Sequence, residues 1–333
     1  MTPAVHRPST LAVAAALGTV YVLWGSTYLA IAYVVESMPP LLAGGARFLT
    51  AGLTLVAFLV ARDRWRAARG APRGPALRWP RAIEWRTALI VGTLLFLGGN
   101  GMVMFGELTI PSGIAAVIIA TTPIWLSVFD ALLTRRSPSL LAITGLLVGL
   151  FGVAVLLLPS SGLDSFDPWG IGILVVAAIC WASGSLYARR GPLPSNQLLG
   201  TGMEQIAGGL VLIAVGAAVG EIGSFDPARI TMASVLGLAF LLVFGSLVAF
   251  TAYAWLLNNV AVTTVATYAY VNPVVAVALG FVFRGETLSL RSLLAAALII
   301  GAVIAMVSGR PRDVEESGLS PEAALLGSGP EPS

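Results

Sequence analysis

The sequence predicts an all-α membrane protein with ten transmembrane helices, arranged as two inverted repeats of five helices each. Hydrophobic residues make up 57% of the chain and charged residues only 11%, whereas about a quarter of a soluble globular chain is charged. The hydrophobic part also contains an internal sequence repeat, because segments of the first half recur in the second half at a nearly constant offset. Finally, the basic residues gather on one side of the predicted helices.

The internal repeat is visible in three pairs of short segments. Trp24-Gly25-Ser26 returns as Trp181-Ala182-Ser183 and Ala51-Gly52-Leu53 as Gly208-Gly209-Leu210, both at an offset of 157, and Thr122-Pro123 returns as Asn272-Pro273 at an offset of 150. Since each copy has an odd number of helices, the second copy enters the membrane from the opposite side. Inverted repeats related by a pseudo-two-fold axis in the membrane plane are typical of secondary transporters.

Ten apolar stretches are long enough to cross about 30 Å of hydrocarbon as helices. They lie at residues 11–33, 40–61, 87–106, 112–133, 140–158, 169–188, 197–219, 233–256, 262–283 and 289–308. The first is too long for the apolar region of a signal peptide and leads into further membrane helix, so we expect it to be retained. The predicted domains are a first repeat at 12–158, a second repeat at 169–308, and a disordered cytoplasmic tail at 309–333, which is rich in Pro, Gly, Ser and Glu.

The placement of the arginines predicts the orientation. All 19 basic residues are arginines; fifteen fall on one side of the membrane, three on the other, and Arg47 lies within it. By the positive-inside rule, both termini are cytoplasmic. The equivalent loops 135–139 and 285–289 agree, because the first carries two arginines and the second carries a glutamate. Orientation and attraction to anionic lipid explain the arginine run at 62–86, so we expect no nucleic-acid partner.

Several classes of chemistry are excluded by what the chain lacks. It has one cysteine, Cys180, and one histidine, His6, so it has neither a disulfide framework nor a histidine-based metal site. We find no phosphate-binding loop, no dinucleotide-binding turn and no catalytic triad. The sequence therefore predicts no cofactor, no metal site and no enzymatic activity.

Charged residues inside the predicted helices are candidates for function, because each costs about 2.5–3.5 kcal/mol on insertion scales. Arg47 and Glu204 occupy equivalent positions in the two copies, each about 10 Å along its helix at 1.5 Å per residue. In the functional interpretation, Arg47 binds a substrate carboxylate, and Glu204 serves a cation or a coupling proton. The alternative is an internal ion pair that only stabilises packing, and direct pairing is left open. Glu107 and Asp130 lie at helix ends, where snorkelling or a basic neighbour such as Arg135 explains them.

Two prolines, Pro123 and Pro273, lie near the middle of the fourth and ninth helices. Proline removes a donor and frees carbonyl groups, and interrupted helices at matching positions of two repeats indicate a transporter's binding site. We expect these prolines to act as hinges, with a plain kink as the alternative. The other candidate substrate-binding residues are aromatic or polar: Trp24, Ser26, Asn100, Thr122, Trp125, Trp181, Tyr253, Tyr268, Tyr270 and Asn272. Interfacial tryptophans and interhelical hydrogen bonds are the alternative explanations.

With these residues, the chain resembles the EamA family of the drug/metabolite transporter superfamily. The resemblance rests on Trp24-Gly25-Ser26, on Pro39-Pro40 with Arg47-Phe48, and on Val271-Asn272-Pro273-Val274 followed by Gly285-Glu286. It covers 12–158 and 169–308, one family unit each. It implies a bacterial inner-membrane carrier that exports amino acids, metabolites or toxic compounds, with its substrate cavity between the repeats and helices five and ten at the periphery. The first unit departs from the family pattern at Arg136, where a glutamate is common, and the predicted topology explains that change.

The predicted function is export of a small metabolite by alternating access, either secondary-active or facilitative. Aromatic rings suit the apolar body of an amphipathic solute and Arg47 suits a carboxylate, so we expect a neutral amino acid or a related compound. A broad-specificity drug efflux carrier and a non-transporting membrane sensor or subunit are the alternatives. Proton coupling through Glu204 and facilitated diffusion both stay open, as do the substrate's identity, the transport direction and the oligomeric state.

Overall fold

The chain is all-helical in the part that the structure describes. The computed structural model describes residues 9–69, 78–110, 115, 118–135, 140–157, 167–284 and 290–308, and these form helices and turns without a strand. Six of the described helices are long and apolar enough to cross a membrane, and three shorter apolar helices accompany them. The predicted helical class is confirmed to this extent. The predicted tail at 309–333 and loop residues 136–139 and 285–289 lie outside the described residues.

The helices of the first half begin with a capped N-terminus, where the Ser9 hydroxyl accepts a hydrogen bond of 3.2 Å from the backbone N–H of Ala12. A side-chain oxygen at this position satisfies one of the N–H groups that a helix start leaves free. The elements are α1 (Thr10–Val35), α2 (Pro40–Ala68), α3 (Ala82–Gly92), the π-helix η1 (Thr93–Gly101), α4 (Met102–Gly106), α6 (Thr122–Thr134) and α7 (Leu140–Leu157).

The helices of the second half have similar starts, capped by the side chains of Asp167 and Asn196. The elements are α8 (Pro168–Arg190), α9 (Gln197–Ala218), α10 (Glu221–Ser224), the 3₁₀-helix η2 (Pro227–Arg229), α11 (Met232–Phe240), the π-helix η3 (Leu241–Ala249), α12 (Phe250–Asn259), α13 (Val262–Ala266), α14 (Tyr268–Arg284) and α15 (Leu290–Ser308). Every one of the ten apolar stretches of the sequence contains helical residues.

Two of the long helices are interrupted by π-helical segments that the sequence did not predict. In the first half, η1 follows α3 and continues into α4; in the second half, η3 follows α11 and continues into α12. Each π segment has nine residues. π-helical turns are rare and are frequently found at functional sites. Since each π segment lies in the middle of a long helix, the space between the two segments is a candidate for a functional site.

The two predicted hinge prolines lie beside interruptions of their helices. Pro123 is in the first turn of α6, which begins at Thr122 after a turn at Thr121. Pro273 lies inside α14, and a turn at Thr267 separates α14 from α13. Proline is tolerated in a first helical turn because that N–H has no intrahelical partner. Whether the two positions act as hinges stays a prediction.

The closest packing in the bundle joins α2 to α9 through glycines. A Cβ atom on Gly52 would lie 2.5 Å from the carbonyl oxygen of Gly202, and one on Gly45 would lie 3.0 Å from the carbonyl oxygen of Gly209. The pairing runs in opposite directions along the two helices, so α2 and α9 are antiparallel. Small residues let helix backbones approach this closely. The contact fixes α2, which carries Arg47, against α9, which carries Glu204.

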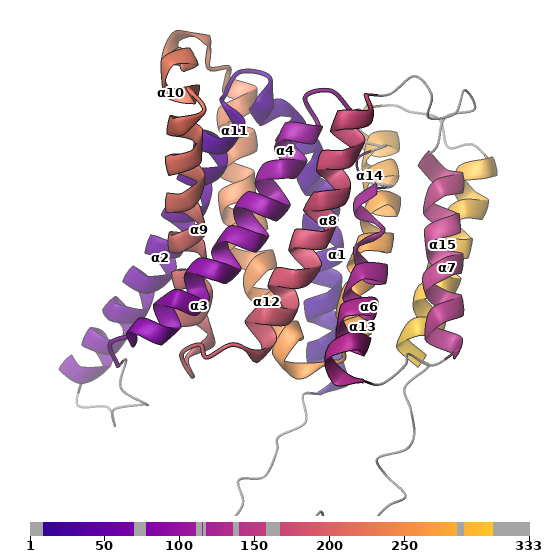
Figure 1. The fold of residues 1–333 in the computed structure, drawn as a ribbon, viewed down its shortest axis with the longest axis horizontal. Helices are drawn as coiled ribbons and strands as arrows, with labels where there is room; N and C mark the ends of the chain where they lie inside the picture. Colours follow the sequence, from indigo (N-terminus) through magenta and orange to yellow (C-terminus); the bar gives the residue numbers. More distant parts are fainter. Residues whose placement is uncertain are drawn as a thin grey trace, which may run out of the picture.

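Figure 1 shows this pair towards one edge of the bundle, with the remaining helices extending away from it. The helices α7 and α15 lie side by side at one edge of the bundle and pack on α14, while α9 and α10 lie at the opposite edge. The centre of the bundle holds α1, α8 and α12. The largest apolar core cluster of the described residues includes Trp24 of α1, Phe96 of η1 and Tyr253 of α12, and Trp181 of α8 packs against it. This central position of α1, α8 and α12 places their aromatic residues around the candidate site.

Candidate substrate site

A small cavity, here called the arginine cavity, lies among α1, α2, η1, α8, η3 and α14. Its volume is about 80 Å³. Seven of the residues that the sequence predicted as substrate-binding line it: Trp24, Arg47, Asn100, Thr122, Trp181, Tyr268 and Asn272. Lining residues that the sequence did not single out include Tyr28, Phe48, Gly99, Gly245 and Phe250. The cavity is therefore lined mainly by aromatic, aliphatic and small polar residues, with one cationic side chain.

The Arg47 guanidinium is held on one side and free on the other. Its Nε donates a hydrogen bond of 2.7 Å to the Ser246 hydroxyl, its Nη1 has no hydrogen-bond partner, and the residue is only 4% exposed. Gly245 leaves room for this group, since a Cβ there would lie 2.7 Å from Nη2. A buried cation with an unused N–H group beside a cavity is suited to bind a carboxylate through charge-assisted hydrogen bonds.

Four aromatic side chains, here called the aromatic cluster, close the arginine cavity at one end: Trp24, Trp181, Tyr253 and Tyr268. The ring of Trp24 lies 5.4 Å from Trp181, 4.8 Å from Tyr253 and 5.0 Å from Tyr268, measured between centroids. These separations are typical of favourable aromatic pairs. Hydrogen bonds fix two members, from Trp24 Nε1 to the Gly245 carbonyl at 3.2 Å and between Tyr253 and Ser185 at 2.5 Å.

A second cavity, here called the glutamate cavity, adjoins the aromatic cluster at Tyr253. Its volume is about 330 Å³, and it is lined by Leu95 of η1, the end of α8, residues of the segment 191–197, the first turns of α9 and one face of α12. Glu204 and Tyr253 line it, and Phe250 lines both cavities. Arg47 and Glu204 therefore face different cavities, and no ion pair joins them among the described contacts.

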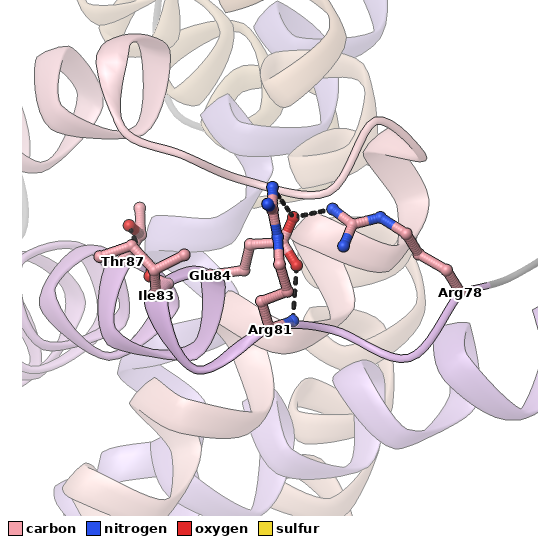
Figure 2. Close-up of polar contacts among 5 residues, drawn as sticks. All are labelled: Arg78, Arg81, Ile83, Glu84 and Thr87. Atoms are coloured by element: carbon pink, nitrogen blue, oxygen red, sulfur yellow. Dashed lines mark hydrogen bonds and ion pairs between the residues drawn. The ribbon is translucent and has the colours of Figure 1, made fainter.

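The buried carboxylates of the described chain fall into two groups. Glu84 is 1% exposed, and Figure 2 shows it between Arg78 and Arg81: the Arg78 guanidinium donates to Oε1, and the Arg81 backbone N–H donates to Oε2 at 2.7 Å. The carboxylate of Glu221 accepts from the backbone N–H groups of Leu41 and Leu42 at the start of α2, at 3.1 and 2.9 Å. These two glutamates thus stabilise helix starts.

Glu204 and Glu107 form the second group, which has no such partners. Glu204 is 4% exposed and makes no hydrogen bond or ion pair in the described structure. Both carboxylate oxygens of Glu107 are enclosed without a partner, so snorkelling, which we expected, does not describe this residue. Asp130 has a basic partner as expected, but the partner is Arg190, at 2.7 Å, rather than Arg135. A buried carboxylate without a partner is costly and is commonly found where it has a function.

Three of the predicted substrate-binding residues lie outside both cavities. The Ser26 hydroxyl donates to the Val22 carbonyl of its own helix at 2.7 Å, and Trp125 Nε1 donates to the Thr121 hydroxyl at 3.3 Å. The Tyr270 hydroxyl donates to the Leu146 carbonyl on α7 at 3.1 Å. Two further predicted residues, Glu204 and Tyr253, line the glutamate cavity. Pro123 and Pro273 line neither cavity.

Some of the residues that sequence reasoning missed belong to the π segments. Gly99 of η1 and Gly245 of η3 line the arginine cavity beside the predicted Asn100, and Ser246 of η3 holds Arg47. The Asn100 amide donates to the Leu95 carbonyl five residues earlier, at 3.4 Å, as the wider π turn allows. The glycine pair Gly98-Gly99 was visible in the sequence, but the π geometry has no recognisable composition.

A chain with several helices long and apolar enough to cross a membrane, and with a cavity lined by helices of both halves, has the construction of a membrane transporter. The comparisons identify the group to which it belongs. The EamA-like transporter family matches the chain twice, at residues 10–158 and 168–308. The chain therefore belongs to the EamA-like transporter family.

Individual relatives agree with this assignment. The chain is 39% identical over 296 residues to YedA of Escherichia coli strain K12, an uncharacterized inner membrane transporter, covering 89% of this chain and 90% of YedA. It is 26% identical to YvbV of Bacillus subtilis strain 168, an uncharacterized transporter, covering 89% of this chain and 91% of YvbV. A solved crystal structure superposes with a TM-score of 0.67 at 22% identity, covering 89% of this chain and 96% of that one, which supports the fold alone. These two relatives are transporters rather than enzymes.

Proposed function

We propose that the protein exports a neutral amino acid, or a related small amphipathic metabolite, by alternating access. The observation that carries this proposal is Arg47, a buried guanidinium with an unused N–H group beside an aromatic cavity. A carboxylate at Arg47 with an apolar body against Trp24 and Tyr268 would use both features. Arg47, Trp24, Asn100, Thr122, Trp181, Tyr268 and Asn272 are the proposed substrate-binding residues, and Pro123 and Pro273 the proposed hinges.

The proposed architecture is a pair of inverted five-helix repeats at 12–158 and 169–308. The glycine contacts between α2 and α9 support it. At the offset of 157 residues, Gly45 is equivalent to Gly202 and Gly52 to Gly209. Exchanging the two copies therefore turns the contact of Gly45 with Gly209 into the contact of Gly202 with Gly52, and both contacts occur. Two antiparallel helices with reciprocal contacts are what a pseudo-two-fold axis between inverted copies requires.

For the membrane location we propose a bacterial inner membrane, as for YedA, with both termini in the cytoplasm. The arginine distribution supports this orientation. Fusions of a reporter to the segment 70–77 and to the C-terminal tail should be active only when the reporter requires the cytoplasm. A fusion to the segment between α10 and α11 is the control and should be active only with a periplasmic reporter. Periplasmic activity at 70–77 would overturn the orientation.

Transport itself is tested with purified protein in liposomes. Liposomes loaded with unlabelled L-phenylalanine should accumulate labelled L-phenylalanine with saturation, and protein-free liposomes should not. An imposed pH gradient distinguishes the coupling modes: proton coupling predicts acceleration that Glu204→Gln abolishes, and facilitated diffusion predicts no effect in either protein. Binding in detergent without flux, across a panel of amino acids and cationic drugs, would reject the carrier and favour a sensor.

The aromatic lining of the arginine cavity keeps one alternative, a broad-specificity efflux carrier for drugs or toxic compounds. Trp24, Trp181 and Tyr268 would stack on a planar cation without the help of Arg47. Liposomes distinguish the two functions by substrate. Flux of ethidium that survives Arg47→Gln, with no flux of L-phenylalanine, would replace the amino-acid proposal with the drug proposal.

A further inference from the structure

The glutamate cavity is the larger of the two cavities and has a size suited to a ligand. Its volume of about 330 Å³ falls within the range of roughly 300–1,000 Å³ typical of small-molecule sites, whereas the arginine cavity, at about 80 Å³, is below it. The conformation described here thus has room for a solute at Glu204 and not at Arg47. We ask which solute the glutamate cavity would take.

The strongest chemical feature of this cavity is the carboxylate of Glu204. Glu84 and Glu221 are also buried, but arginines or backbone N–H groups satisfy them. Glu204 has no such partner in the described structure, although it is only 4% exposed. Burying a carboxylate away from water without a cationic partner costs several kcal/mol. A cation bound in the cavity beside Glu204 would offset that cost.

Other polar groups of the cavity point to a solute of more than one charge. Arg189, at the end of α8, is exposed and lines the cavity, and the Gln197 amide nitrogen is buried without a hydrogen-bond partner. Glu204 lies seven residues farther along α9 than Gln197, which is about 10 Å at 1.5 Å per residue. The cavity thus carries an acidic group in its interior and a basic group and an amide donor near the segment 191–197.

The apolar part of the lining comes from α12. Phe250, Tyr253 and Leu257 lie one turn apart on this helix and all line the cavity. A ring such as that of Tyr253 also attracts an ammonium group by cation–π interaction. The lining therefore combines an aromatic and aliphatic wall with one carboxylate.

We propose that the glutamate cavity is a second solute site, which recognises a primary ammonium group on a small apolar body through Glu204. That the bound compound is the transported one rests on the proposed function; the binding itself does not. Such a solute would place its ammonium group at Glu204 and its apolar body against Phe250, Tyr253 and Leu257. To reach Arg47 it must pass the aromatic cluster, whose members Trp24 and Tyr253 are in contact here.

The position of Thr87 shows how the cavity wall is held. Thr87, on the α3 turn that follows Glu84 in Figure 2, lies against Gly191, where a Cβ would be 2.7 Å from Thr87 Cγ2. Leu193 of the same segment packs with the cluster of Leu59, Ala88 and Leu199. The start of the segment 191–197 is therefore packed against α3 at Gly191 and Leu193.

The test is equilibrium binding of two monofunctional probes to purified protein in detergent, measured by isothermal titration. Phenethylamine carries only the ammonium group and 3-phenylpropionate only the carboxylate. We expect Glu204→Gln to weaken the binding of phenethylamine at least 10-fold, the order expected for a lost charge-assisted hydrogen bond. The exposed control Glu36→Gln should change it less than two-fold. Unchanged affinity in Glu204→Gln, or an equal loss in Glu36→Gln, would overturn the proposal.

A second variant tests the cavity by shape rather than charge. A Cβ on Gly200 would meet Leu193 and Pro194 at ordinary contact distances of 3.8 Å, so Gly200→Leu fills the cavity without a backbone clash. It should abolish phenethylamine binding, while Gly172→Leu, at a glycine with open space around it, should not. Binding that survives Gly200→Leu would reject this location. The result is separable from transport: phenethylamine binding at Glu204 without L-phenylalanine flux would reject the proposed function and keep the site.

Discussion

Replacing Arg47 with glutamine should reduce L-phenylalanine transport in liposomes by about 10- to 100-fold, because one hydrogen bond to a charged group contributes about 1.5–3 kcal/mol. The free energy of unfolding should not fall. Arg47 pairs with no carboxylate in the described structure, and its Nη1 is buried without a partner, so removal of the charge also removes a desolvation cost. Transport rates and thermal unfolding in detergent, measured on the same preparations, check the predicted loss of transport and the predicted absence of a loss in stability.

The opposite pattern would contradict the binding role of Arg47. An arginine that only stabilises packing would, on replacement, lower the unfolding temperature and leave flux unchanged. Arg47→Lys is the matched control, because it keeps the charge but loses the planar group whose Nε reaches Ser246. Transport by Arg47→Lys should lie between wild type and Arg47→Gln. Equal activity of the lysine and glutamine variants with wild type would exclude Arg47 from the site.

Much of the fold and part of the site could be predicted from the sequence. Hydropathy located the helices because apolar length is a direct requirement of the bilayer. Arg47 and Glu204 could be predicted for a similar reason, because a charged residue inside an apolar helix is costly and rare. Seven predicted residues line the arginine cavity. The prediction succeeded where one residue's chemistry conflicts with its surroundings.

The rest depended on facts that composition does not encode. The repeated segment Trp24-Gly25-Ser26 predicted Ser26, and its place beside Pro273 predicted Tyr270. The first bonds its own helix and the second bonds α7, which only the helix rotation decides. Ser246 and Gly245 matter because η3 is a π-helix that turns them towards Arg47. Likewise, Glu84, Glu204 and Glu221 are all glutamates of helical segments, and only their partners separate the two that stabilise helix starts from the one that faces a cavity.

The α2–α9 contact gives the second large effect, which is on stability. Gly52→Ala should lower the unfolding temperature by on the order of a few °C, since overpacking costs about 1–3 kcal/mol and each kcal/mol shifts the unfolding temperature of a large chain by roughly 2 °C. The new Cβ would lie 2.5 Å from the Gly202 carbonyl oxygen and 2.7 Å from the Ile206 nitrogen. Both are backbone atoms, so no side chain can rotate away, and the helices must separate.

The equivalent residue of the second copy and an open glycine complete this experiment. Gly209→Ala should destabilise the protein by a similar amount, because its Cβ would lie 2.5 Å from the Leu49 nitrogen. Gly18→Ala should leave the unfolding temperature unchanged or raise it, since nothing lies within 4 Å of that Cβ and alanine favours a helix by about 1 kcal/mol over glycine. Unfolding followed by light scattering or fluorescence in detergent measures all three. If Gly52→Ala and Gly18→Ala unfolded at the same temperature, α2 and α9 would not be in backbone contact, and the reciprocal glycine pairs would no longer support the inverted repeat.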